Sequence, residues 1–129
     1  MRAGAASWLA VAGLILAAEA SWTQQPGTTT EITYLLNEVA ISPCEFYRNG
    51  KWYQGRQAAT HLRSKYGARP PWEHIGTAEE FIERIAARSS SSGADYMIRC
   101  AGTTEVPCAS WLRSRLAVFR RSHGDPQKP

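Results

Sequence analysis

The sequence predicts an α+β fold of about four helices with a small antiparallel strand element, made of a hairpin at 45–53 and a strand at 95–100. Three observations indicate this fold. Four segments carry apolar residues at helical spacing, as amphipathic helices do. The dipeptide Asn49-Gly50 lies between two aromatic segments, where it favours a tight hairpin turn. The segment YMIRC alternates between two faces, as a strand does.

The first predicted helix lies in TTTEITYLLNEVAISP. Thr28 and Glu31 have the spacing of an N-terminal capping box, and Pro43 ends the helix. The buried face of this helix would consist of Ile32, Leu35, Leu36 and Val39.

The next segment, CEFYRNGKWY, predicts the hairpin because both central positions of a type I′ turn need positive φ angles, which Asn and Gly tolerate. This turn sets three pairs opposite one another: Tyr47 with Trp52, Phe46 with Tyr53, and Arg48 with Lys51. The last pair carries like charges. Its long side chains either extend separately into water or gather an anion at the turn.

Two further helices follow the hairpin. GRQAATHLRSKYG predicts a helix whose C-terminal left-handed position is taken by Gly67. Its inward face would hold Ala58, Ala59, Leu62 and Tyr66. After a proline-containing loop, a third helix begins with a capping box of Thr77 and Glu80. Its apolar face would hold Phe81, Ile82, Ile85 and Ala86.

The segment Ser89–Gly93 ends the third helix, either by satisfying its last carbonyl groups or as a flexible hinge. In the strand that follows, one face would hold Tyr96, Ile98 and Cys100. The last predicted helix runs from about Cys108 to Arg121. It would turn Leu112, Leu116 and Phe119 inward, with Trp111 beside them.

The first twenty residues predict export. Arg2 precedes an apolar run from Trp8 to Ala18, and small residues at Ala18 and Ala20 suit a signal peptidase. The run is much shorter than the roughly 20 residues that cross a bilayer. We therefore expect a signal peptide that is cleaved near Ala20, no stable membrane span, and a periplasmic or secreted protein. An uncleaved membrane anchor is the alternative.

The rest of the chain is expected to divide into three parts. A flexible leader would occupy residues 21–30, a single α+β domain residues 31–121, and a disordered tail residues 122–129.

The cysteines Cys44, Cys100 and Cys108 predict one disulfide in an oxidising compartment. Three pairings are open. We favour Cys44–Cys100, because each of these residues flanks a predicted strand. Cys108 would then be free, join two chains in a covalent dimer, or act as a nucleophile at the start of a helix, where its pKa could be lowered. The last role lacks a nearby base in the sequence.

The formal net charge is +4, and the charges are scattered. The one basic doublet is Arg120-Arg121, so nothing predicts a nucleic-acid partner. A mildly basic exported protein suits an anionic wall polymer or an envelope protein as its partner.

The histidines are His61, His74 and His123, and none has a metal-ligand spacing, so we expect neither a metal nor a cofactor. His61 lies in the second predicted helix, one turn before Lys65. As a general base it would need an orienting carboxylate and a nucleophile, and the sequence offers few candidates. The favoured interpretation is a partly buried histidine that is hydrogen-bonded to a neighbouring group.

Trp52 and Trp72, next to turns, are the tryptophans expected to be exposed.

Four spaced motifs carry a family resemblance. They are Phe46-x-Arg48-Asn49-Gly50, Ala58-x-x-His61-Leu62-x-x-Lys65, Thr77-Ala78-Glu79-x-Phe81-Ile82 and Ser89-Ser90-x-Ser92-Gly93-x-x-Tyr96. Together they resemble the YfeK-like family of small exported bacterial proteins of unknown function, over about Phe46 to Ile98. The resemblance implies a periplasmic or secreted location and no established activity. It singles out Arg48, Asn49, His61, Lys65 and the Ser89–Gly93 turn, and it lends the Cys44–Cys100 pairing little support.

The leading hypothesis is a non-enzymatic binding or inhibitor-like domain that contacts an anionic envelope component or a partner protein. Its candidate binding residues are Arg48, Asn49, Trp52, His61 and Lys65. Because the hairpin leads directly into the helix that holds His61, we expect Arg48, His61 and Lys65 to converge on one basic, partly aromatic patch. One alternative is a small cell-envelope hydrolase that uses His61 as a general base. Another is a dimeric structural protein joined through Cys108.

Overall fold

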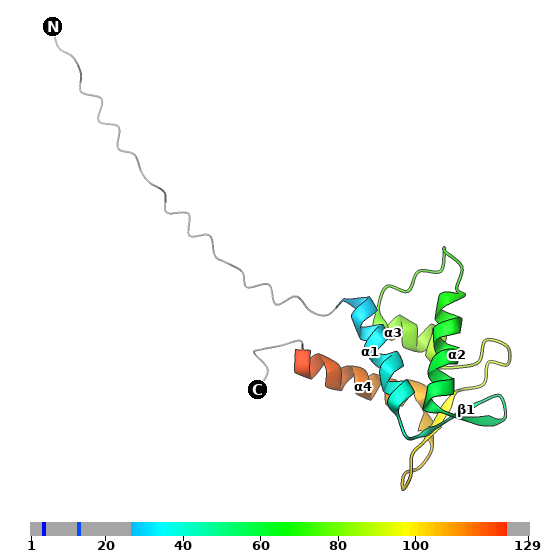
Figure 1. Cartoon of the computed structure of the whole chain (residues 1–129). Coiled ribbons are helices and arrows are strands. Elements are labelled where there is room, and N and C mark those ends of the chain that lie inside the picture. The colour runs from blue at the N-terminus through cyan, green and yellow to red at the C-terminus, as the bar shows by residue number, and fades with distance from the viewer. Residues whose placement is uncertain (1–3, 5–12, 14–26, 124–129) are drawn as a thin grey trace.

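The computed structural model describes residues 27–123 together with Gly4 and Gly13, and it has the α+β fold that the sequence predicts (Figure 1). Its helices are α1 (Thr28–Ile41), α2 (Gly55–Gly67), α3 (Ala78–Phe81), which continues into the π-helix η1 (Ile82–Ala86), and α4 (Cys108–His123). Its strands are β1 (Glu45–Arg48), β2 (Lys51–Gln54), β3 (Met97–Arg99) and β4 (Val106–Pro107). They form one antiparallel sheet of order β2-β1-β3-β4 within the described residues.

The expected signal peptide at 1–20 lies outside the described residues, apart from Gly4 and Gly13, and so do residues 21–26 and 124–129. Where the structure does describe the predicted leader and tail, their boundaries are wrong. Residues 28–30 already belong to α1, and residues 122–123 still belong to α4.

The predicted capping box of α1 is also wrong. Gly27 is the N-cap residue and makes no side-chain cap. Thr28 Oγ1 instead donates to the carbonyl of Gly76 at 2.8 Å. Glu31 is buried, and its carboxylate accepts hydrogen bonds from Arg120 in the last part of α4, which compensate for the loss of water. A local spacing rule could not indicate this partner, which is 89 residues away in sequence.

The helices cover one face of the sheet, and the core lies between them. Phe46 and Ile98 point from the sheet into this core, where they meet the apolar faces of the helices. α1 and α2 run side by side (Figure 1). They can pack closely where α2 begins because Gly55 has no side chain, and a Cβ atom there would lie only 2.2 Å from the carbonyl oxygen of Val39. The four apolar residues predicted for α1 and those predicted for α3 are buried.

The hairpin forms with the predicted register. Asn49 has a φ angle of 46° and Gly50 one of 87°, as a type I′ turn requires. Tyr47 lies opposite Trp52, Phe46 opposite Tyr53, and Arg48 opposite Lys51. β1 also pairs with β3 on its other side, so the hairpin is an integral part of the sheet.

The ends of α2 and α3 differ in part from the prediction. Gly67 does not adopt a positive φ angle, so it is not a left-handed cap. The C-cap residue is Ala68, whose N–H donates to the carbonyl of Ser64, and Arg69 Nη1 donates to the carbonyl of Tyr66 at 2.5 Å. The predicted cap at Thr77 is confirmed, because its Oγ1 accepts from the backbone N–H of Glu80 at 3.1 Å. The Glu80 carboxylate accepts from Gly76, one residue earlier than in a capping box.

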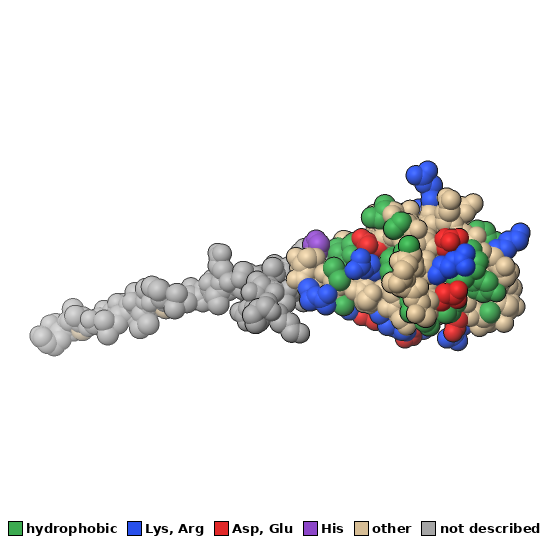
Figure 2. Space-filling view, turned by 90° about the horizontal axis from the view of Figure 1, so that it is seen from below, with side chains coloured by type: hydrophobic (Ala, Val, Ile, Leu, Met, Phe, Trp, Pro, Cys, Tyr) green, Lys and Arg blue, Asp and Glu red, His purple; other side chains and the backbone are tan. Residues whose placement is uncertain are grey.

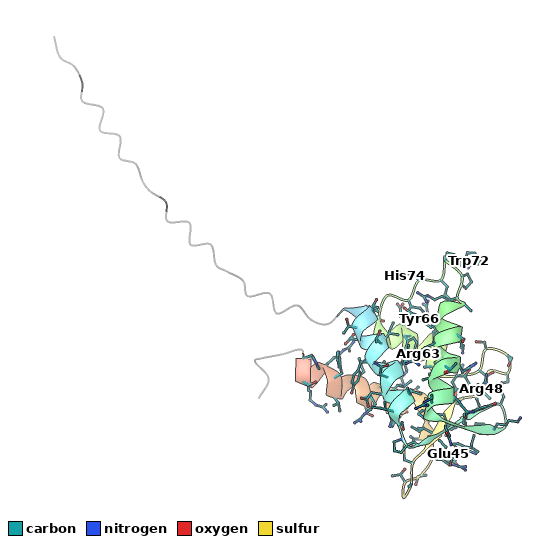
Figure 3. The ribbon with its side chains drawn as sticks, viewed as in Figure 1. Glu45, Arg48, Arg63, Tyr66, Trp72 and His74 are labelled. Carbon is teal, nitrogen blue, oxygen red and sulfur yellow. A yellow bond between two sulfur atoms is a disulfide. The ribbon has the colours of Figure 1, made fainter. Side chains whose placement is uncertain are left out.

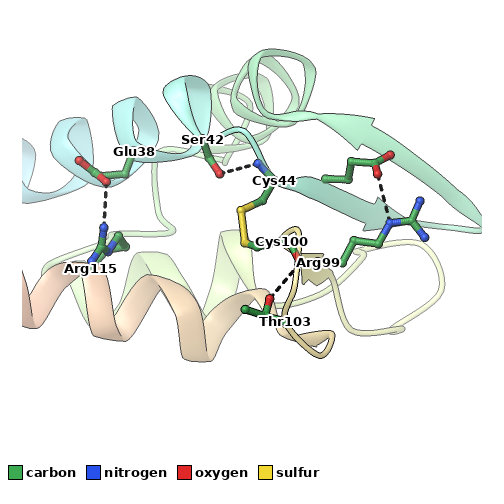
Figure 4. The surroundings of a disulfide bond; sticks show 8 residues. Glu38, Ser42, Cys44, Arg99, Cys100, Thr103 and Arg115 are labelled. Carbon is green, nitrogen blue, oxygen red and sulfur yellow. Dashed lines mark hydrogen bonds and ion pairs between the residues drawn. A yellow bond between two sulfur atoms is a disulfide. The ribbon is translucent and has the colours of Figure 1, made fainter.

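The predicted disulfide between Cys44 and Cys100 is present (Figure 4). It joins the chain just before β1 to the chain just after β3. Thr103 Oγ1 caps the carbonyl of Cys100 at 3.0 Å in the turn that follows. On the loop-entropy model, closing this 56-residue separation stabilises the fold by about 4 kcal/mol.

The charged side chains are dispersed. Figure 2 shows basic and acidic groups interspersed on the face it presents, without a stripe of one sign. Among the described residues, no helix is both long enough and apolar enough to cross a membrane.

Candidate functional site

The candidate site lies where the hairpin, α2 and the Ser89–Gly93 turn meet. Arg48 is the last residue of β1. His61 and Lys65 are one turn apart on α2, so they share a face of that helix. Tyr96, just before β3, completes the group. Arg48, His61 and Lys65 therefore converge, as the sequence led us to expect.

The contact between Arg48 and His61 defines the protonation state of the histidine. Arg48 Nη1 lies 2.8 Å from His61 Nδ1 and 3.3 Å from Nε2. A guanidinium group can only donate, so we assign the accepting role to Nδ1, the nearer ring nitrogen, and the ring proton to Nε2. Nε2 then donates to the hydroxyl of Tyr96 at 3.2 Å. Burial, together with the positive charges of Arg48 and Lys65, lowers the pKa of His61 and keeps it neutral.

Lys65 also contacts Tyr96. Its Nζ donates to the carbonyl of Arg88 at 2.7 Å and lies 3.5 Å from the Tyr96 hydroxyl. Burial lowers the pKa of Lys65 and raises that of Tyr96, so the phenol keeps its proton. The Tyr96 oxygen accepts from both His61 and Lys65, which leaves its own O–H free to donate to a ligand.

The Ser89–Gly93 turn adds serine hydroxyl groups to the candidate site. Ser92 Oγ donates to Asn49 Oδ1 at 2.9 Å, which fastens the turn to the tip of the hairpin. Within the turn, the buried Ser89 Oγ accepts from the backbone N–H groups of Ser91 and Ser92, both at 3.3 Å. The segment is thus a hydrogen-bonded turn whose hydroxyl groups bond within the turn and to Asn49, whereas the last helix carbonyls, of Ala87 and Arg88, accept from Tyr96 N–H and Lys65 Nζ.

Two neighbouring hollows result from this arrangement. The first, which we call the polar hollow, has a volume of about 360 Å³, and its lining includes Arg48, Asn49, His61, Lys65, Ser91 and Tyr96. The second, the apolar cavity, has a volume of about 120 Å³, and its lining includes Phe46, Tyr53, Ala58, Leu62 and Cys108. Arg48, His61 and Tyr96 line both, so they form a shared wall.

The charged residues that line the polar hollow are all basic. Among residues 27–123, no aspartate or glutamate lines either hollow. Within the described part of the chain, Arg48 and Lys65 make no salt bridge with a carboxylate, whereas Arg99, Arg113, Arg115 and Arg120 do. The hollow therefore presents two positive charges and several hydrogen-bond donors, which suits an oxyanion.

Trp52, a predicted binding residue, does not lie beside Arg48, His61 and Lys65. It lies on the opposite face of the sheet from Arg48, where its ring packs against Tyr47 and the guanidinium of Arg99 lies 3.9 Å from the ring centroid. Trp72 is 85% exposed, in the loop after α2 (Figure 3). That loop is at the end of the molecule away from Glu45 and the sheet.

Sequence reasoning missed the role of Tyr96, which it placed on one face of the last predicted strand and not among the candidate binding residues. The residue is buried, yet its hydroxyl is the point at which His61 and Lys65 meet. Its place at the end of the fourth family motif was the signal that could have identified it.

The surroundings of His61 and Cys108 in the described structure bear on the hydrolase hypothesis. Both ring nitrogens of His61 are occupied, by Arg48 and by Tyr96, and no carboxylate orients the ring. Cys108 lines the apolar cavity and is buried, and burial raises the pKa of its thiol to about 12. A buried neutral thiol opposes both the nucleophilic role and the covalent dimer considered for this residue. No cluster of metal-ligating side chains occurs among the described residues.

The fold and site define a class: a small, disulfide-bonded α+β domain with a basic hollow beside its hairpin. The chain belongs to the DUF5329 family, a family of unknown function whose model matches residues 16–120. It is similar to the uncharacterized protein YfeK of Salmonella typhimurium, with 34% identity over 88 residues, which cover 67% of this chain and 72% of that protein. The YfeK-like resemblance is thereby confirmed. No solved structure matches the chain.

Proposed function

We propose that this protein is an exported, non-enzymatic binding domain that holds an anionic group of an envelope component or partner protein in the polar hollow. One observation carries the proposal: Arg48 and Lys65 face the same hollow, and neither is neutralised by a carboxylate of the described chain. Cations that are held in place without a partner attract an anion more strongly than cations that are already paired.

The site is also organised in advance. The neutral His61 holds the guanidinium of Arg48, and the backbone carbonyl of Arg88 holds Lys65. Because these contacts restrict two long side chains, less conformational entropy is lost when a ligand binds. Tyr96 and the serine hydroxyls add neutral donors around the two charges.

Export supports the choice of partner. The predicted signal peptide would deliver the domain to the cell envelope, where anionic polymers and lipids are abundant, and the disulfide suits an oxidising compartment. The interior position of Cys108 favours a chain that acts without a covalent partner of its own kind.

The test compares two charge reversals. A variant with Arg48→Glu and Lys65→Glu removes the positive hollow, and a matched control with Arg84→Glu and Arg56→Glu makes the same change of net charge at exposed residues that do not line it. Co-sedimentation of each protein with isolated cell-wall sacculi, and its retention on immobilised envelope extract, are then measured. We expect the first variant to lose most of the binding and the control to keep it. A charge-reversed hollow that keeps every interaction of the parent contradicts the proposal.

A further inference from the structure

The shared wall between the two hollows carries an inference about the chemical class of the ligand. We infer that the ligand is an amphipathic oxyanion, with a carboxylate or phosphate head at Arg48 and a short alkyl arm in the apolar cavity. This inference rests on the proposed function, and it specifies what kind of anion the site selects.

The first argument is the chemical contrast between the hollows. The apolar cavity is formed by Phe46, Leu62 and other carbon-rich groups, whereas the polar hollow next to it is rich in donors. Ligand sites in proteins commonly combine an apolar pocket with a few polar groups that fix orientation. Arg48 belongs to both linings, so a head group that binds its guanidinium lies at the edge of the cavity.

The second argument is size. At roughly 30 Å³ for each water-sized group, the cavity of about 120 Å³ holds about four such groups. It is smaller than the roughly 150 Å³ cavity that accommodates benzene. The arm is therefore short, about four carbons long, and a long acyl chain would extend beyond the cavity into water.

The third argument is that the protein leaves this space unused. The side chains around it are held in place: Leu62 is 4% exposed in α2, Phe46 is 5% exposed in β1, and Cys108 is fixed at the start of α4 by a 2.8 Å hydrogen bond from its N–H to the carbonyl of Tyr96. A small void with apolar walls lacks van der Waals partners and is a poor site for water. Methylene groups of a ligand would supply the missing contacts.

The experiment titrates the folded protein with a series of linear carboxylates from acetate to heptanoate, at constant ionic strength, and follows backbone amide shifts by NMR. We expect affinity to rise by up to about fourfold for each added methylene as far as pentanoate, and to level off beyond it. Pentanamide, which has the same arm without the charge, should bind at least about tenfold more weakly than pentanoate. Butyl phosphate, measured in parallel, identifies the preferred head group.

Ala58→Leu is the matched variant, because Ala58 lines the cavity and a leucine there would fill it. In this variant acetate and pentanoate should bind equally. Independently of any substitution, intermolecular NOEs from the terminal methyl of pentanoate to Leu62 and Phe46 in the unmodified protein should locate the arm.

The possible results distinguish the inference about the alkyl arm from the proposed anion-binding function. Carboxylates that bind with one affinity whatever their length, or a pentanoate methyl without NOEs to the cavity, overturn the inference and leave the anion site standing. Failure of every carboxylate and of butyl phosphate to bind overturns both, as does pentanamide that binds as tightly as pentanoate.

Discussion

Arg48 and His61 form a cation–imidazole hydrogen bond between β1 and α2, with 2.8 Å between Nη1 and Nδ1. This contact requires a neutral ring, because a protonated imidazole has no lone pair to accept the bond. The histidine therefore serves to position the arginine, and its protonation state determines whether the basic hollow remains assembled.

The first prediction concerns the titration of His61. Its pKa should lie below the ordinary value of about 6.5, because burial and the charges of Arg48 and Lys65 disfavour the imidazolium. Arg48→Gln removes one of these charges and should raise the pKa, whereas Arg84→Gln should leave it unchanged. NMR titration of the imidazole C–H signals measures both. A pKa at or above the ordinary value, or no change in Arg48→Gln, contradicts the assignment.

The first prediction also has a consequence for stability, because the same pKa shift links folding to pH. With the folded pKa below the unfolded one, the unfolded chain binds more protons between the two values. The free energy of unfolding should therefore fall as pH decreases from about 6.5 through the folded pKa of His61, and this contribution should level off below it. Urea unfolding of the parent and of His61→Gln, compared across that range, isolates the effect. Equal pH dependence of the two proteins would refute it.

The second prediction concerns Arg120, which joins three helices. Its guanidinium donates to the buried Glu31 of α1, at 2.6 and 3.0 Å, and to Glu79 of α3. Arg120→Met should lower the free energy of unfolding by about 2 kcal/mol, because Glu31 would be left without its donors. Glu79→Gln should cost less than about 1 kcal/mol, because Glu79 is 46% exposed. Urea denaturation at neutral pH measures both, and equal losses would show that Glu31 does not depend on Arg120.

The third prediction concerns the disulfide. Replacement of Cys44 and Cys100 by serine together should lower the free energy of unfolding by about 4 kcal/mol, since the unfolded chain regains the freedom of a loop with a 56-residue separation. Urea unfolding of the double variant at neutral pH measures the loss. The parent treated with reductant should show the same loss. A reduced parent as stable as the oxidised one would mean that the bridge contributes nothing.

The fourth prediction concerns Cys108. This residue is 2% exposed and the pKa of its thiol is raised to about 12, so iodoacetamide should leave it unmodified in the folded protein and label it once in urea. Mass spectrometry counts the adducts. A non-reducing gel of the same sample should show a monomer. Rapid labelling of the native protein, or a covalent dimer, would show that α4 opens at its first turn.

The sequence alone was sufficient for features that depend on neighbouring residues. Asn49-Gly50 defines the hairpin, its register and the faces of β1 and β2. The helical spacing in residues 55–67 gives the bounds of α2. These features follow from backbone preferences and short-range periodicity, which a single sequence contains.

Features that depend on distant partners could not be predicted in this way. Glu31 has the spacing of a capping residue, and only the position of α4 shows that it binds Arg120. β4 consists of Val106 and Pro107 alone, too short and too unusual in composition to be recognised as a strand. At the site, Arg48, His61 and Lys65 were predicted to converge, whereas Trp52 lies on the other face of the sheet because strand residues alternate.

The central claim is that Arg48 and Lys65 bind an oxyanion in the polar hollow. Its most direct test is an NMR titration with sodium phosphate at constant ionic strength, comparing the parent with Arg48→Gln and Arg84→Gln. We expect phosphate to shift the amide signals of Asn49, Ser91 and their neighbours, with affinity about tenfold lower in Arg48→Gln and unchanged in Arg84→Gln. Signals that respond to phosphate no more than to chloride, or equal loss in both variants, would contradict the claim.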